Sequence, residues 1–141
     1  MTTAEATRLL EQFRAGKLTR DAVLHAFQAA PVADLGYAQV DTHRALRKGF
    51  PEVIYGAGKT PAQVAGIAAH LVKQGQRVLA TRLGPDHAKL LKKKFALARH
   101  HEAARCVTIE KTPAPKRPGT IAVICAGTSD LPVAEEAAVT A

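Results

Sequence analysis

The chain has 141 residues and a mass of 15.0 kDa, which gives room for one domain or two small ones. Apolar residues make up 47% of it and charged residues 23%, a composition that excludes general disorder. No apolar run approaches the roughly 20 residues that span a bilayer, and the start lacks the basic head and apolar run of a secretory signal. We therefore expect a soluble, cytoplasmic protein that has no membrane partner.

The basic charge is concentrated in one part of the sequence. The chain has a net charge of +8, and residues 73–117 alone carry 12 basic and 3 acidic residues, a net of +9. Such a segment favours a polyanionic partner, either nucleic acid or a phosphate-bearing small molecule. The alternative is a solvated, lysine-rich helix face around Lys92, Lys93 and Lys94. Nucleic acid is the weaker partner, because aromatics are only 4% and Trp is absent, which leaves few platforms for base stacking.

Residues 1–34 are predicted to form a helical hairpin. Apolar residues recur with helical spacing over 3–15, and Thr19 can cap a second helix that ends before Pro31.

Residues 35–110 are predicted to form a small α/β unit. Short strands are expected at 37–40, 52–55, 77–82 and 105–109, and helices at 60–75 and 84–94, with a single helical turn around Arg44 and Arg47. The best helix start is Thr60-Pro61-Ala62-Gln63, which offers a capping hydroxyl, a proline at the first helical position and a glutamine at the third. Strands that alternate with helices indicate parallel packing.

Residues 111–119 hold three prolines and a glycine and are predicted to be a linker. The run that follows, 120–125, is apolar at every position but Thr120, which is typical of a central parallel strand buried on both faces. A helix is predicted to begin at Pro132. Residues 120–141 therefore read as one strand followed by one helix.

Two junctions between a strand and a helix could bind anions. Gly56-Ala57-Gly58-Lys59 precedes the capped helix, so free backbone N–H groups and the Lys59 ammonium could face a phosphate or carboxylate. A nucleotide-binding P-loop would need glycine at Val53, so this match is weak. The alternative is an ordinary glycine turn before a helix.

The second junction is residues 126–130, after the buried strand, where ligands bind in open α/β sheets. Gly127 allows close approach, Thr128 and Ser129 offer hydroxyls, and Asp130 could hold ribose hydroxyls. The alternative is that Ser129 or Asp130 only caps the helix.

Three blocks of the sequence resemble one enzyme family. The stretch GTIAVICAGTSDLPVAEEA, residues 119–137, is similar to the start of the catalytic domain in the LarB family, the pyridinium-3,5-biscarboxylic acid mononucleotide synthases. Two further blocks support the resemblance: VDTHR (40–44) with RKGFPEVI (47–54) and GKTP (58–61), and then VLATR (78–82). The resemblance covers roughly residues 35–141, in the family's order.

The resemblance implies a fold as well as a reaction. The fold is α/β: the hairpin and small α/β unit, then the first β–α unit of a doubly wound parallel domain like that of PurE, the purine-pathway aminoimidazole ribonucleotide mutase. That enzyme has a Gly-Ser-x-Ser-Asp turn. Ser129 and Asp130 match its last two positions, and Gly127 replaces its first serine, which argues for a different substrate.

The substrate implied is nicotinic acid adenine dinucleotide, whose pyridinium ring the family carboxylates at C5 with carbon dioxide. The family also hydrolyses the phosphoanhydride and releases AMP, in a step of nickel-pincer nucleotide synthesis. Temporary addition of a thiolate makes C5 an enamine carbon that can attack carbon dioxide. The family's cysteine would lie beyond Ala141, so we expect this chain to be an incomplete enzyme with no activity by itself, and its catalytic residues are unknown.

The substrate-binding candidates are cationic and turn residues within these blocks. We expect an anion cradle for the dinucleotide pyrophosphate and a contact to the rest of the substrate, made by Arg44, Arg47, Lys59, Arg82, Gly127, Thr128, Ser129 and Asp130. No metal-ligating residues are predicted, and Mg²⁺ is the one cofactor left open. The resemblance also implies a homo-oligomer, an octamer in that family. The alternatives are a mutase-like enzyme of purine synthesis and a nucleotide- or nucleic-acid-binding module.

The cysteines and the paired histidines are assigned structural places. Cys106 and Cys125 both fall in predicted strands; Cys125 is expected in the core and Cys106 is assigned a structural role. Two cysteines are too few for a disulfide framework. His100 and His101 are neighbours and cannot both face one site on a strand, so a solvated turn is predicted there.

Overall fold

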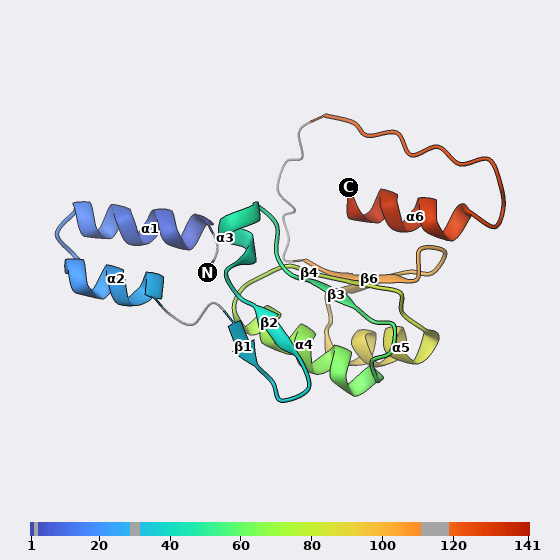
Figure 1. The fold of residues 1–141 in the computed structure, drawn as a ribbon, viewed down its shortest axis with the longest axis horizontal. Coiled ribbons are helices and arrows are strands. Elements are labelled where there is room, and N and C mark those ends of the chain that lie inside the picture. Colours follow the sequence, from blue (N-terminus) through green and yellow to red (C-terminus); the bar gives the residue numbers. More distant parts are fainter. Residues whose placement is uncertain (2, 29–31, 111–118) are drawn as a thin grey trace. The chain divides into compact units, whose positions relative to one another are not determined.

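The computed structural model describes Met1 and residues 3–28, 32–110 and 119–141. The chain divides into two compact units, Met1–Glu52 and Val53–Ala141, and Figure 1 shows the elements of both. The predicted linker, 111–119, lies outside the described residues except for Gly119. None of the described helices is long and apolar enough to cross a membrane.

The first unit begins with the predicted pair of helices. Helix α1 spans Thr3–Arg14 and α2 spans Arg20–Gln28. The Thr19 hydroxyl accepts a hydrogen bond from the backbone N–H of Ala22 at 3.2 Å, so Thr19 caps α2 as expected. Only Ala6 and Val23 are buried in these helices, and the hairpin therefore has a thin core.

A two-stranded sheet and a short helix complete the first unit. Strand β1 (Val32–Asp34) pairs antiparallel with β2 (Gln39–Asp41). The prediction found β2 nearly in place and missed β1. Helix α3 (Arg44–Lys48) is the predicted helical turn, and Gly49 ends it with a φ of 79°.

The second unit opens with a β–α–β–α run that follows the prediction. Its elements are β3 (Val53–Tyr55), α4 (Pro61–Lys73), β4 (Val78–Thr81) and α5 (Pro85–Lys94). The capping box at the start of α4 is complete: the Thr60 hydroxyl accepts from the N–H of Gln63 at 3.3 Å, and the Gln63 side chain accepts from the N–H of Thr60 at 2.9 Å.

The prediction of all-parallel packing is wrong for the last strand. Strands β5 (Ala98–His101) and β6 (Cys106–Ile109) form an antiparallel hairpin, and the sheet order is β3-β4-β6-β5. Only β3 and β4 are parallel. The four-residue connection from β5 to β6 is far too short for the crossover that a parallel pair needs. His100 and His101 therefore lie in a strand and not in the solvated turn predicted for them.

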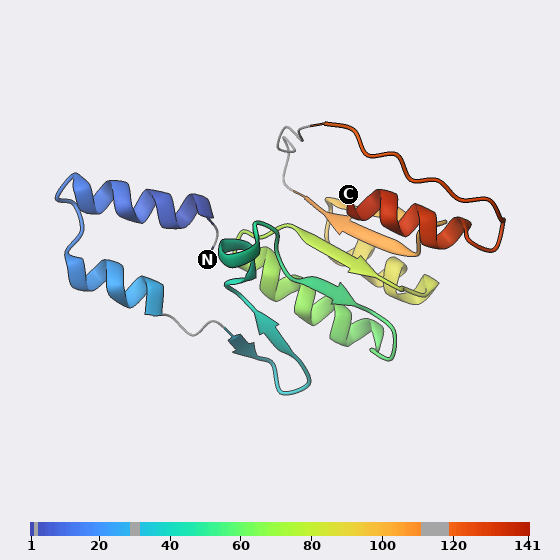
Figure 2. The same ribbon diagram turned by 45° about the horizontal axis from the view of Figure 1, so that its top comes forward.

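Helices α4 and α5 cover one face of this sheet (Figures 1 and 2). The buried core between them is aliphatic and includes, in the strands, Ile54, Val78, Ala80, Val107 and Ile109, and in the helices, Val64, Ile67, Ala68, Leu71 and Leu91. This layered arrangement is the α/β fold that the sequence predicts.

Residues 120–125 do not form the predicted central strand. They are extended but pair with no strand of the described chain, and Ile121 and Ile124 are 71% and 91% exposed. A strand that is apolar on both faces needs paired neighbours and cover on each side, and the four-stranded sheet supplies neither to this segment. The expectation that Cys125 is a core residue fails for the same reason, since Cys125 is exposed. Helix α6 (Leu131–Thr140) forms as predicted, with no buried residue.

Candidate anion-binding site

A polar region of the second unit lies at the carboxyl ends of the two parallel strands, β3 and β4. The loop 56–60 connects β3 to α4, and the loop 82–84 connects β4 to α5. Because β3 and β4 are parallel neighbours, both loops emerge at the same edge of the sheet, which is where α/β proteins bind ligands. Each loop leads directly into the N-terminus of a helix, where backbone N–H groups and the helix dipole favour an anion.

Gly56 lets these two loops meet. A Cβ atom at this position would overlap Cδ2 of Leu83 and would lie 2.9 Å from the carbonyl oxygen of Thr81. The N–H of Gly56 donates to that same oxygen at 2.8 Å, which continues the strand pairing by one residue. This glycine therefore serves the close approach of the neighbouring loop.

The first loop is a tight turn that presents Lys59. The N–H of Lys59 donates to the carbonyl oxygen of Gly56 at 3.1 Å, and Gly58 has a φ of 78°, a conformation that favours glycine. The Lys59 ammonium donates to the carbonyl oxygen of Tyr55 at 2.9 Å. This partner is a neutral carbonyl, and a charged oxygen would form a stronger bond with the ammonium.

His87 of α5 joins the two loops. Its Nε2 atom lies 2.8 Å from the carbonyl oxygen of Lys59, and its Nδ1 atom accepts from the N–H of Gly84 at 3.3 Å. Sequence reasoning left His87 without a role. The available signal was its position three residues after Gly84, which is the position from which a side chain reaches back to a helix cap.

The side chain of Arg82 contacts the last helix, α6. It has a φ of 55°, and its Nε atom lies 2.8 Å from Oε2 of Glu136 in α6. In this arrangement the guanidinium has a carboxylate partner of its own. The structure therefore brings the main chains of Lys59 and Arg82 to one edge of the sheet, while the Arg82 charge is paired elsewhere.

The thiol of Cys106 is buried and held as a neutral group. Its Sγ atom donates to the carbonyl oxygen of Ala104 at 3.1 Å. Burial raises the pKa of the Cys106 thiol to about 11, with the nearby Glu136 carboxylate adding to the rise, while Arg82 and Arg105 oppose it. The structural place predicted for Cys106 is confirmed, and such a thiol is a poor nucleophile at neutral pH.

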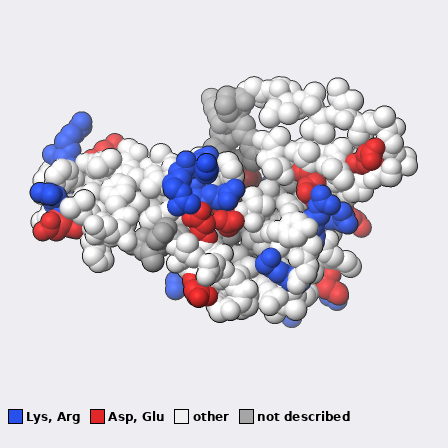
Figure 3. All heavy atoms as spheres, viewed as in Figure 1, with Lys and Arg blue, Asp and Glu red and all other residues white. Residues whose placement is uncertain are grey.

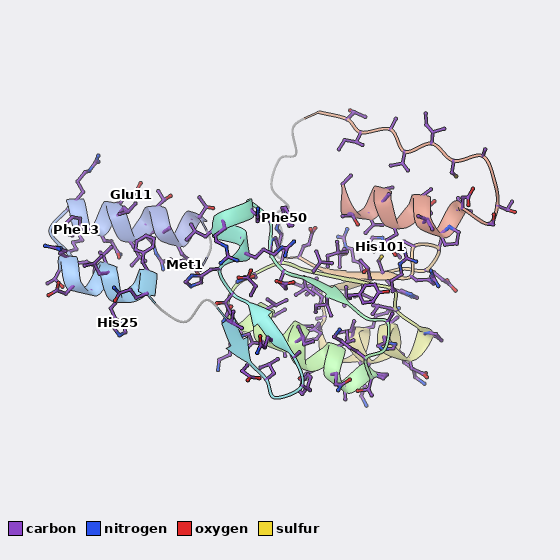
Figure 4. The ribbon with its side chains drawn as sticks, in the orientation of Figure 1. Met1, Glu11, Phe13, His25, Phe50 and His101 are labelled. Carbon is purple, nitrogen blue, oxygen red and sulfur yellow. The ribbon has the colours of Figure 1, made fainter. Side chains whose placement is uncertain are left out.

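Arg44 and Arg47 lie in the first unit, on α3, each beside an acidic residue. Arg47 contacts the Asp41 carboxylate at 2.6 Å, and Arg44 lies 4.0 Å from Glu52. The Arg44 guanidinium stacks 5.1 Å from the centre of the Phe50 ring. Figure 3 shows this mixture of basic and acidic side chains over α3, and Figure 4 labels Phe50 beside the helix.

Residues 127–130 form an exposed turn before α6. Asp130 occupies the capping position of α6 but makes no side-chain capping hydrogen bond. The N–H of Asp130 donates to the carbonyl oxygen of Gly127 at 3.1 Å, and Thr128, Ser129 and Asp130 are exposed. The side chains of this turn are therefore accessible to a ligand.

The histidines do not assemble a metal site. No group of three or more His, Cys, Asp or Glu side chains within the described ranges could hold a metal ion. His101, labelled in Figure 4, lies 3.0 Å from the hydroxyl of Thr108 on the paired strand. Burial lowers the pKa of His43, and the N-terminal ammonium and Arg47 lower it further, while Asp41 opposes them.

Comparison with known proteins gives the chain its family. It is 32% identical over 105 residues to an uncharacterized protein of Methanocaldococcus jannaschii, an alignment that covers 70% of this chain and 41% of that protein. The chain thus corresponds to less than half of that relative's length. The model of the LarB/PurE-like N-terminal domain matches residues 32–111, a range that contains β1 to β6 and both loops of the candidate site. The chain therefore belongs to the LarB/PurE-like N-terminal domain family.

Proposed function

We propose that this chain acts in a carboxylase of the LarB type and binds the pyrophosphate of a pyridine dinucleotide at the loops 56–60 and 82–84. The reaction proposed for the whole protein is carboxylation of nicotinic acid adenine dinucleotide at C5 of its pyridinium ring, with hydrolysis of the phosphoanhydride and release of AMP. The observation that carries the proposal is the family match over residues 32–111, which includes both loops.

The chemistry of the loops supports a phosphate ligand. Two helix N-termini lie at one sheet edge, and each favours negative charge within its first turn. The Lys59 ammonium would exchange the neutral Tyr55 carbonyl for a phosphate oxygen, and a charge-assisted hydrogen bond is about twice as strong as a neutral one. Binding would therefore replace a weaker contact with a stronger one.

The other predicted residues receive secondary roles in this proposal. Arg82 would leave Glu136 to reach the same anion, and Arg44 and Arg47 keep their predicted role as contacts to the substrate. Gly127, Thr128, Ser129 and Asp130 would contact the ribose or the ring from their exposed turn. The partners proposed are the dinucleotide, carbon dioxide or bicarbonate, and further copies of the chain, with Mg²⁺ as an optional aid to phosphate binding.

Titration calorimetry with nicotinic acid adenine dinucleotide tests the proposal. Lys59→Ala should weaken binding by roughly ten- to a hundredfold, because a hydrogen bond to a charged group is worth ~1.5–3 kcal/mol. Lys73→Ala is the matched control, since Lys73 is an exposed lysine at the other end of α4. Equal affinity of wild type and Lys59→Ala, with and without Mg²⁺, would exclude the loop as the phosphate site.

Binding experiments with the same protein test two competing functions. Exposed Lys92, Lys93, Lys94 and Arg99 favour a nucleic-acid-binding module, which would bind arbitrary DNA or RNA with a steep salt dependence. A mutase-like protein would instead bind aminoimidazole ribonucleotide in preference to the dinucleotide. Saturable binding that is selective for the dinucleotide supports the carboxylase.

A further inference from the structure

We propose that His87 is a positioning residue, which fixes the Lys59–Thr60 peptide group and thereby sets the affinity of the loop for an anion. This inference deepens the proposed function and rests on it for the identity of the ligand. We call the two hydrogen bonds of His87, to the carbonyl oxygen of Lys59 and from the N–H of Gly84, the tie. The geometry of the tie does not depend on any ligand.

Both ends of this peptide group are held by side chains from two different helices. Its carbonyl oxygen lies 2.8 Å from Nε2 of His87 in α5. Its N–H, which belongs to Thr60, donates to Oε1 of Gln63 in α4 at 2.9 Å. The peptide plane that connects Lys59 to Thr60, the capping residue of α4, therefore cannot rotate without the loss of one of these bonds.

The hydrogen bonds also assign the tautomer of His87. Because the N–H of Gly84 donates to Nδ1, that nitrogen carries no proton. The proton of the neutral ring is then on Nε2, which donates it to the carbonyl oxygen of Lys59. The other tautomer would place two donors against each other at Gly84 and two acceptors against each other at Lys59. Only one ring state satisfies both loops.

The tie acts on the part of the loop that would meet the anion. It holds Thr60, the capping residue at the N-terminus of α4, where the helix dipole favours an anion. With the tie lost, the loop keeps the turn from Lys59 to Gly56, the capping box and the bond from the Lys59 ammonium to Tyr55. The Lys59–Thr60 peptide group would then have to be ordered when an anion binds, which weakens binding.

Two conservative variants separate the two halves of the tie. His87→Gln keeps a donor at the position of Nε2 and loses the acceptor for Gly84, whereas His87→Asn keeps an acceptor near Nδ1 and loses the donor for Lys59. His70→Gln is the control, because His70 also lies on a helix of this unit and pairs with a glutamine, Gln74, at 2.9 Å.

The ligand-free chain provides the first measurement. Nitrogen chemical shifts of the imidazole should show Nε2 protonated and Nδ1 unprotonated. Amide hydrogen exchange at Lys59 and Thr60 should accelerate about fivefold in His87→Asn and stay near the wild-type rate in His87→Gln. The opposite tautomer, or equal exchange in both variants, would overturn the positioning role whether or not the chain binds a dinucleotide.

Affinity provides the second measurement, with inorganic pyrophosphate and nicotinic acid adenine dinucleotide as the ligands used. His87→Asn should bind both about fivefold more weakly than wild type, and His87→Gln within twofold of it. A purely structural His87 would lower the melting temperature in both variants and leave their affinities equal, which contradicts the proposal. If wild type binds neither compound, the proposed function fails, and the tautomer and exchange results still decide the role of His87.

Discussion

Gly56 and Leu83 belong to two different loops and are packed so closely that no side chain fits between them. A Cβ atom at Gly56 would overlap the Leu83 side chain and crowd the Thr81 backbone. We expect Gly56→Ala to lower the free energy of unfolding by about 1–3 kcal/mol, as is typical of overpacking. Urea denaturation monitored by circular dichroism measures this loss.

Gly84→Ala is the matched control for that experiment. A Cβ at Gly84 would meet only Nδ1 of His87, at 3.6 Å, which is ordinary contact. The control should therefore cost less than Gly56→Ala. Equal losses at the two positions would show that the close approach of the loops is not what requires glycine at Gly56.

The two cysteines should differ sharply in reactivity. Cys125 is exposed, whereas Cys106 is buried and has a pKa raised to about 11. At pH 8 a disulfide-exchange reagent should modify one thiol rapidly and the second only after denaturant is added, because the thiolate is the reactive form. The fast phase should disappear in Cys125→Ser and persist in Cys106→Ser. Rapid reaction of both thiols in the native chain would contradict the burial of Cys106.

His43 should make the chain less stable in acid. Its pKa is below the ordinary 6.5 in the folded state, chiefly through burial and the nearby N-terminal ammonium. The unfolded chain therefore binds this proton more readily, so the contribution is fully present above pH 6.5 and is lost as pH falls through the lower, folded value. Thermal melts between pH 7.5 and 5 should show a smaller decline for His43→Gln than for wild type.

The ion pair between Arg82 and Glu136 should govern how α6 is held. Helix α6 buries none of its residues, so this 2.8 Å contact is a large part of its attachment. In Glu136→Gln, amide hydrogen exchange within α6 should accelerate, while exchange in β4 and β6 stays unchanged. Glu135→Gln, a neighbouring exposed glutamate, should have no such effect. Unchanged exchange in Glu136→Gln would show that other contacts hold the helix.

The elements that sequence reasoning predicted well are those whose signals are local. Helix α4 carries its own capping box and apolar stripe, and Thr60, Pro61 and Gln63 act as their spacing indicates. The direction of β6 was missed, because the choice between parallel and antiparallel depends on the length of the connection from β5, which itself was read as a turn. Residues 120–125 have a strand pattern without strand partners, and a pattern alone forms no sheet.

The candidate site was predicted only where its signals are local in the sequence. The loop with Gly56, Gly58 and Lys59 could be recognised from the sequence, since glycines and a lysine stand before a capped helix. The role of His87 depends on a partner 28 residues away, which no local spacing reveals. The charge partner of Arg82, Glu136 of α6, is likewise distant in the sequence.

The sheet mixes parallel and antiparallel strands, and this limits where the fold can acquire new binding functions. A crevice of the α/β kind requires two neighbouring strands that end on the same side, and β3 with β4 is the one such pair in the sheet of the described chain. Substitutions that change ligand preference should therefore accumulate in 56–60 and 82–84, while the core residues of the β5–β6 hairpin, such as Val107 and Ile109, are retained. A directed-evolution library for a new phosphate ligand would be built on these two loops, with Gly56 kept as glycine.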